Sequence, residues 1–194
     1  EAPPNVTLNF PIDSFRNDSV DIIFNYTPRD PIGINNCSFY FDGERNQTDE
    51  LIDMNEPNYF NLSGIAEGTH NWTVKCVDAF PDYNEFTADE EIFIIDLSGP
   101  VINITFPADG QTLNNNNVTF NWTPVDYNGT YINCSIFVTD NPTNRSGNVY
   151  ELSNTSFTIE FTNMTDGLHY WNLTCTDDLG NPTSTDIMNF TINQ

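Results

Sequence analysis

The sequence predicts an all-β protein made of two similar β-sandwich domains in tandem, and three observations support this. Apolar and polar residues alternate along much of the chain, which is typical of strands with one buried face. Turn residues separate these segments at short intervals, and no segment shows a sustained helical period. The motifs of the first half recur about one hundred residues later, which is the size of a whole β-sandwich domain.

The repeat sets the domain organisation. The matched segments are 6–13 with 102–109, 24–28 with 120–124, 36–38 with 133–135, 68–76 with 167–175 and 92–94 with 189–191. A short segment at 95–100 joins the two halves, and its proline at position 100 stiffens it. We therefore expect one domain over residues 1–97 and a second over residues 98–194.

Each half is interpreted as about seven strands. In the first half we expect them near 5–10, 19–26, 34–41, 47–52, 58–63, 69–77 and 86–95. In the second half we expect them near 101–106, 117–123, 131–138, 148–152, 155–162, 168–176 and 185–192.

The sixth strand of each half shows the design most clearly. In the second half His169, Trp171 and Cys175 share one face, which we expect to be buried, while Asn172 lies on the other. The first half repeats the arrangement with His70, Trp72, Cys76 and, on the outward side, Asn71.

The cysteines indicate two disulfides and an oxidising compartment, because the four are divided evenly between the halves. They occupy equivalent positions in the third and sixth strands. This equivalence favours the pairs Cys37–Cys76 and Cys134–Cys175 over pairs that cross between the domains.

The charge excludes some partners. The chain has 28 acidic and 5 basic residues, a net charge of −23. Nucleic acid and anionic membrane surfaces need a basic footprint, which this sequence lacks. No apolar run approaches the length of a membrane span. Because the acidic residues are scattered rather than clustered, they are typical of a soluble, mutually repelling surface. A salt-adapted or cation-binding surface is the alternative.

N-glycosylation sequons are the sharpest functional signal. There are 17 of them among 29 asparagines, whereas random placement of the 32 Ser and Thr residues would give roughly five. They begin at Asn5, Asn17, Asn25, Asn36, Asn46, Asn61, Asn71, Asn103, Asn117, Asn121, Asn128, Asn133, Asn144, Asn154, Asn163, Asn172 and Asn189.

The middle residue of the sequons is apolar in twelve of the 17, as in those with Trp72, Trp122 and Leu173 at the centre. In a strand this residue points inward, so the Asn and the Ser or Thr both point outward. Asn is a poor strand former, and a glycan gives a reason for it in mid-strand. The alternative is that Asn and Thr only fill outward positions. We expect glycans on the sheet faces.

No group of residues predicts catalysis, and we expect no enzyme activity and no cofactor. The sequence has no phosphate loop, no Cys-x-x-Cys and no recurring Ser/His/Asp order.

His70 and His169 are expected to have structural roles rather than to bind a ligand. The turn after Asp177 and Asp178, with Asp78 and Asp82 at the related turn, is interpreted as turn chemistry. A Ca²⁺ site there is the alternative, although no full ligand loop is present.

These motifs resemble a known family. Phe-Asn-Trp-Thr-Pro at 120–124, Asn-Cys-Ser at 133–135 and Gly-x-His-x-Trp-x-x-x-Cys-x-Asp at 167–177 are similar to the tandem immunoglobulin-like repeats of archaeal cell-surface glycoproteins. The first half departs from the pattern at 80–84. The resemblance implies two tandem immunoglobulin-like (fibronectin-III-like) β-sandwiches, surface display, N-glycosylation, and roles in surface layers, adhesion or filaments. A fibronectin-like topology would place each disulfide within one sheet.

We therefore expect an extracellular or cell-surface structural subunit, heavily N-glycosylated and assembling with itself into a homopolymeric filament or coat. The alternative is an adhesin segment that recognises carbohydrate or a host protein; a third is an accessory domain of a surface enzyme. Residues 1–10 are a candidate strand for donation between subunits, although we expect them first of all to form the opening strand of their own domain.

Overall fold

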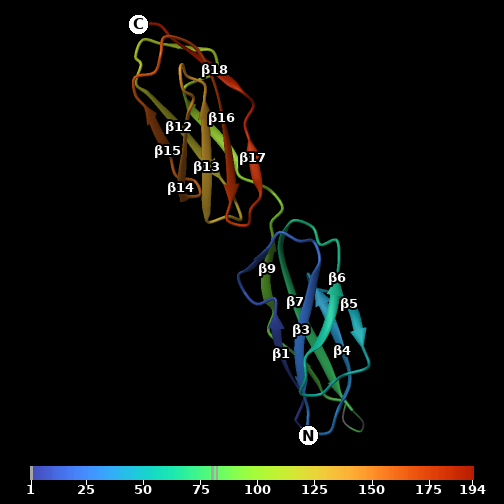
Figure 1. Ribbon diagram of the computed structural model, residues 1–194. Coiled ribbons are helices and arrows are strands. Elements are labelled where there is room, and N and C mark those ends of the chain that lie inside the picture. Colours follow the sequence, from blue (N-terminus) through green and yellow to red (C-terminus); the bar gives the residue numbers. More distant parts are fainter. Residues whose placement is uncertain (1, 80, 82) are drawn as a thin grey trace. The chain divides into compact units, whose positions relative to one another are not determined.

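The computed structural model describes residues 2–79, 81 and 83–194 and is all-β. The chain divides into two compact domains, Glu1–Leu97 and Ser98–Gln194. In the described residues, each domain is a sandwich of a three-stranded and a six-stranded sheet (Figure 1). The predicted fold class, two tandem fibronectin-III-like sandwiches, is confirmed. No helix among the described residues is long and apolar enough to cross a membrane.

The first domain orders β1, β3 and β6 in its smaller sheet and β2, β9, β7, β4 and β5 in its larger sheet, with β8 also paired to β7. Its strands are β1 (Asn5–Phe10), β2 (Phe15–Asn17), β3 (Ile22–Arg29), β4 (Ile34–Phe41), β5 (Glu44–Asp49), β6 (Asn58–Leu62), β7 (Gly68–Asp78), β8 (Glu85–Thr87) and β9 (Glu91–Ile95). The short β2 runs parallel to β9.

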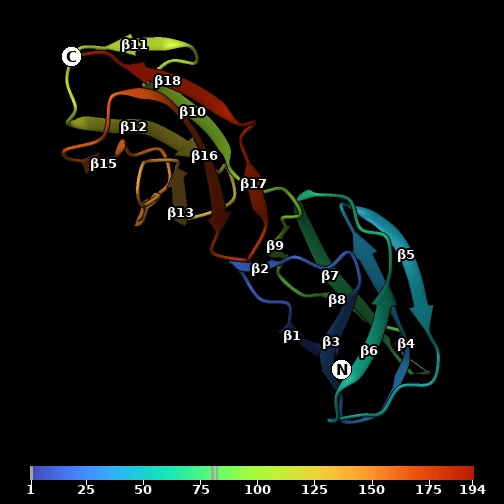
Figure 2. The same ribbon diagram turned by 45° about the horizontal axis from the view of Figure 1, so that its top comes forward.

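The second domain repeats this topology. Its sheets are ordered β10, β12, β15 and β11, β18, β16, β13, β14, with β17 also paired to β16, and Figure 2 shows β11 beside β18. Its strands are β10 (Val101–Phe106), β11 (Gln111–Leu113), β12 (Val118–Val125), β13 (Tyr131–Val138), β14 (Arg145–Leu152), β15 (Phe157–Phe161), β16 (Gly167–Asp177), β17 (Pro182–Ser184) and β18 (Met188–Ile192).

Alternation of apolar residues places the core between the sheets. In β13, Ile132, Cys134, Ile136 and Val138 are buried while the residues between them are exposed. The core is rich in aromatic rings: the Trp171 ring meets Phe120 edge-on at 4.9 Å between centroids, and the Trp72 ring meets Phe24 at 5.0 Å. Such contacts add to the free energy gained from burial.

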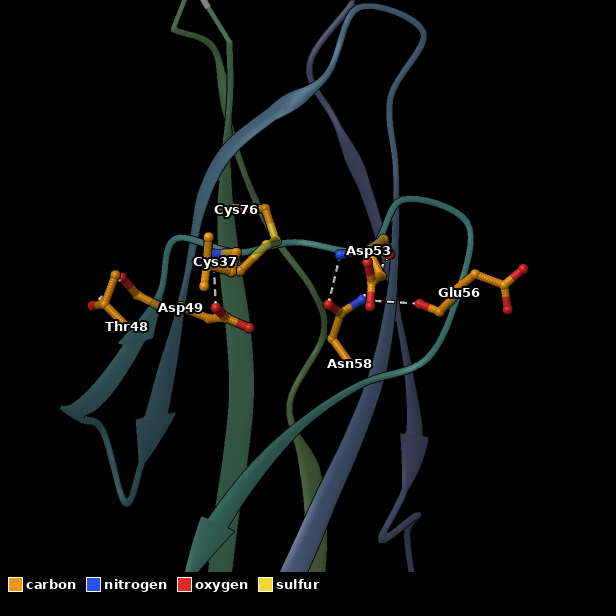
Figure 3. Close-up of a disulfide and its surroundings, with 9 residues drawn as sticks. Cys37, Thr48, Asp49, Asp53, Glu56, Asn58 and Cys76 are labelled. Carbon is orange, nitrogen blue, oxygen red and sulfur yellow. Dashed lines mark hydrogen bonds between the residues drawn. A yellow bond between two sulfur atoms is a disulfide. The ribbon is translucent and has the colours of Figure 1, made fainter.

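Each disulfide joins directly paired residues of neighbouring strands in the larger sheet. Cys37 of β4 bonds Cys76 of β7, as Figure 3 shows. Cys134 of β13 bonds Cys175 of β16. Both pairs are those predicted from the repeat, and both bridges lie within one sheet. Beside the first, the Asn58 amide donates to the carbonyls of Asp53 and Glu56 and so closes the loop before β6 (Figure 3).

The structure corrects two expected strands. The segment 86–95 forms two strands, β8 and β9. Of the segment 185–192 only Met188–Ile192 forms a strand, β18, and the short β17 at Pro182–Ser184 precedes the expected start. The Thr73 hydroxyl donates to the carbonyl of Ala88 at 2.8 Å, and the amide of Leu173 donates to the Thr185 hydroxyl at 3.1 Å. These side-chain bonds stand beside a backbone bond at each break, from the Ala88 amide to the Val74 carbonyl and from the Thr185 amide to the Leu173 carbonyl. Alternation does not reveal such mixed bonding.

Other boundaries move by about three residues. The strand expected at 19–26 is β3, which starts at Ile22 and continues through Pro28 to Arg29. The proline is tolerated because β6 pairs β3 only as far as Tyr26. The strand expected at 47–52 is β5, which begins at Glu44. The three-residue strands β2 and β11 were not predicted, because three residues carry too little alternation.

The first strand belongs to its own domain. β1 pairs antiparallel with β3, with Val6 opposite Pro28 and Leu8 opposite Tyr26. Val6 is buried in the core of the first domain. The opening-strand interpretation of residues 5–10 therefore describes this chain, and the strand is not left open for donation.

Candidate functional site: the outward sheet faces

The sequon asparagines lie outside the core throughout. None of the 17 is buried. Nine are exposed: Asn5, Asn46, Asn61, Asn103, Asn117, Asn133, Asn144, Asn154 and Asn163. Eight are half-buried: Asn17, Asn25, Asn36, Asn71, Asn121, Asn128, Asn172 and Asn189. Each sequon asparagine thus reaches the surface in whole or in part. The Nδ2 of Asn17 donates to the Ser19 carbonyl, and the Nδ2 of Asn189 donates to Asp109 Oδ1.

The residues between them point the other way. Of the twelve apolar middle residues, ten are buried, and Leu62 and Ile104 are half-buried. Tyr26, Trp122 and Phe190 are fully buried at the centres of their sequons. The strand phase predicted from the sequence is the one in the structure, so a glycan on these asparagines would project away from the core.

Neighbouring polar groups orient some of these amides. Asn9 Nδ2 donates at 2.9 Å to both Asn25 Oδ1 and Thr27 Oγ1, the two polar members of one sequon. Fixing the Asn25 oxygen on this side turns its Nδ2 away from Asn9. In the second domain Asn117 Oδ1 accepts from the backbone amide of Asn163, so two sequons meet at one point.

A hollow in the second domain combines sequons with apolar side chains. It has a volume of about 400 Å³ and is lined by Phe106, Leu113, Asn114, Asn115, Asn117, Thr119 and Asn121. Two of the lining residues, Asn117 and Asn121, are sequon asparagines on β12 or at its start. The groove is open and has no titratable group in its lining, so it offers shape and amides rather than acid–base chemistry.

The two histidines hold loops to the larger sheets. His169 contacts the carbonyl oxygens of Thr139 at 2.7 Å through Nδ1 and of Thr165 at 2.8 Å through Nε2. His70 contacts Asp42 Oδ2 at 2.8 Å and the carbonyl oxygen of Ala66 at 2.9 Å. Both ring nitrogens of each histidine are thus engaged within its own domain, which supports the structural interpretation over a ligand role.

The acidic turn after β16 is closed by its own amides. Asp177 Oδ1 accepts from the backbone amides of Leu179, Gly180 and Asn181 at 2.7 to 2.9 Å, and its Oδ2 accepts from Asn181 Nδ2. In the first domain Asp78 likewise accepts from Asn84. These bonds support turn chemistry at both places. Asp178 is exposed, and Asp82 lies outside the described residues.

A buried carboxylate near His169 was missed by the sequence analysis. Asp140 Oδ1 accepts from the Thr165 hydroxyl at 2.7 Å, from the Thr165 amide and from the Asn141 amide, and its Oδ2 accepts from Arg145 Nε at 2.9 Å. Burial alone would raise the pKa of Asp140, but these hydrogen bonds outweigh it and lower the pKa to about 2. The only feature of the sequence that pointed to Asp140 was its position before Asn-Pro.

Comparison with known proteins identifies the fold. No family model matches the chain, and no curated protein matches it. A solved structure described as a bacterial ice-binding adhesin of 1.5 MDa, studied for host cell surface retention, is similar with a TM-score of 0.55 and 15% identity, over 100% of this chain and 66% of that one.

Two further structures are similar. The two-domain structure Rst D1-D2 has a TM-score of 0.53 and 8% identity, over 97% of this chain and 100% of that one. The fibronectin(III)-like modules of Clostridium thermocellum CbhA have a TM-score of 0.45 and 17% identity, over 98% and 95% of the two chains. At these identities the adhesin structure and Rst D1-D2, whose TM-scores exceed 0.5, establish the fold and not the function.

Proposed function

We propose that this chain is an N-glycosylated structural module of an extracellular filament or surface coat. The observation that carries the proposal is the phase of the sequons: none of their asparagines is buried, while ten of the twelve apolar middle residues are. Asn and Thr that only fill outward positions would show the same phase, so the phase makes the sites accessible, and the excess of sequons, 17 against roughly five expected by chance, favours modification. Two intrasheet disulfides support an oxidising, extracellular setting.

Site-resolved glycopeptide mapping of the native protein tests the proposed N-glycosylation. We expect sugar on mid-strand asparagines such as Asn121 and Asn172 as well as on loop sites such as Asn144. Sugar confined to loop sites would contradict the argument from strand phase, because then the outward phase would have no connection with modification.

Assembly with other copies would need strand edges that carry no glycan, and two edges of the second domain are of this kind, with sequons at Asn144, Asn154 and Asn163 in the loops that flank them. In the first domain the edge strands β5 and β6 carry the sequon asparagines Asn46 and Asn61. The corresponding edges of the second domain, β14 and β15, contain no sequon asparagine. An open edge can accept a strand by main-chain hydrogen bonds, which do not depend on side-chain charge.

A single substitution can place a glycan on this edge. Tyr150→Thr converts Asn148-Val149-Tyr150 of β14 into a sequon, and Asn148 is exposed. We expect the variant with sugar at Asn148 to stay folded but fail to assemble under negative-stain microscopy. Tyr150→Val is the matched control, because it also removes the tyrosine but creates no sequon; it should still assemble. Normal assembly of the glycosylated Thr variant would show that β14 is not a contact.

A binding role is the second candidate. Tyr127 is 89% exposed in the loop after β12, and tyrosine is one of the residues enriched in protein interfaces. The similar adhesin structure is from a surface protein. If the chain is an adhesin segment, native material should remain monomeric and bind a carbohydrate or protein target, and Tyr127→Ala should weaken that binding.

A further inference from the structure

Exposed apolar side chains gather around the sequon asparagines. Among the described residues, 18 large apolar side chains are exposed. Seven of them stand directly opposite a sequon asparagine in the neighbouring strand: Phe10, Ile23, Tyr59, Ile92, Phe137, Tyr150 and Tyr170. Directly opposite side chains in an antiparallel pair lie about 5 Å apart at their Cβ atoms, so each of these apolar side chains is within reach of a group attached to the asparagine.

Asn172 has the most complete apolar surroundings. Phe137 lies opposite it on β13, and Tyr170 precedes it by two residues on the same face of β16. With Ile187 and Thr139, these residues line a hollow of about 110 Å³ beside the asparagine. Phe137, Tyr170 and Ile187 are 45%, 47% and 73% exposed, so the lining is open to solvent.

Asn25 repeats the arrangement in the other domain. It stands between Phe10 on one side and Tyr59 on the other. Ile23, two residues before it, is 58% exposed on the same face. The Asn9 amide donates to the Asn25 oxygen and so holds the Asn25 side chain in place beside these residues.

A sugar ring suits such surroundings. One face of a pyranose presents C–H groups, which gain free energy when they cover an aromatic or aliphatic side chain, while its hydroxyls stay in water. An acidic chain without a covering group would otherwise leave several apolar rings in water, as patches that promote association.

Resting on the proposed glycosylation, we infer that the first sugar of each glycan on these faces packs on the apolar side chains beside its asparagine, and that at Asn172 it occupies the hollow formed by Phe137, Tyr170 and Ile187. The glycan is then part of the sheet surface and contributes to stability. The glycan also covers apolar side chains that would otherwise promote association with other molecules.

A double-mutant cycle on the glycosylated two-domain protein tests this. Asn172→Gln removes the sugar, and Phe137→Ser removes the aromatic ring on which the sugar is inferred to pack. We expect sugar loss to lower the unfolding midpoint by roughly 2–4 °C in the parent protein, and by clearly less in the Phe137→Ser background.

Ile187→Ser, at a more exposed position, replaces Phe137→Ser in the cycle if that variant does not fold. Leu168→Ser, on the same strand and face but four residues away, is the control and should leave the cost of sugar loss unchanged.

Two readouts separate this inference from its premise. Glycopeptide mapping first establishes that Asn172 carries sugar; its absence would overturn the proposed modification at this site and the packing with it. With sugar present, nuclear Overhauser contacts between the first sugar and the Phe137 or Tyr170 ring are expected. Occupied Asn172 with no such contacts and equal midpoint losses in both backgrounds would overturn the packing alone.

Discussion

At the scale of single residues, Asp140 of the second domain shows how a buried polar group can stabilise the fold. The carboxyl group of Asp140 is almost fully buried yet accepts four hydrogen bonds, one of them from the Arg145 guanidinium. Together they fix the turn between β13 and β14 to the loop before β16. A buried charge with this many donors stabilises a fold, whereas the same charge without them would destabilise it.

The first prediction follows from the lowered pKa of Asp140. Because its pKa is about 2 in the folded chain, below its usual value of 3.8, the carboxylate contributes stability above about pH 4 and loses it as the pH falls toward 2. We expect Asp140→Asn to cost about 2 kcal/mol near neutral pH and progressively less in acid. Urea unfolding of both proteins across this pH range measures the difference. A constant difference would contradict the assignment.

The second prediction concerns Trp171, which is 1% exposed against Phe120. Trp171→Ala should reduce the free energy of unfolding by roughly 3–5 kcal/mol, because it leaves a large cavity in the core. Tyr127→Ala, at an 89% exposed position of the same domain, is the control and should change it by less than about 0.5 kcal/mol. Equal denaturant midpoints for the two variants would show that the strand phase is wrong.

At the scale of elements, the sequence predicts strands where alternation is long and fails where other bonds decide. β4, β10 and β13 begin and end as expected, since each is bounded by turn or loop residues and turns apolar side chains toward the core. The breaks between β8 and β9 and between β17 and β18 depend on threonine hydroxyls across the sheet, which no local pattern encodes. Likewise, the outward position of the sequons could be predicted from their middle residues, but the apolar side chains opposite them depend on cross-strand register.

The third prediction tests the packing of the segment that leads into β10. A Cβ added to Gly99 would lie 2.7 Å from the carbonyl carbon of Pro182, at the start of β17. Backbone atoms cannot rotate away, so the two segments would have to separate. We expect Gly99→Ala to destabilise the second domain by about 1–3 kcal/mol. An unfolding midpoint equal to that of the parent protein would show that the two segments are not packed together.

At the scale of the whole molecule, each domain combines a dry aromatic core with an acidic outer surface that carries the sequons. The net charge of −23 keeps copies apart over most of this surface. Glycans would extend the same protection to the exposed apolar side chains. Contacts with other copies would then be restricted to edges without sequons, of which β14 and β15 are the clearest.

The intact mass of the native protein is the most direct test of glycosylation at the sequons. The bare chain has a mass of 22.0 kDa. Glycans on most of the 17 sequons would raise the native mass well above this value in discrete sugar increments, and removing them should return it to the bare-chain mass. A native mass equal to that of the bare chain would contradict the account, because the outward phase of the sequons would then have no function in glycosylation.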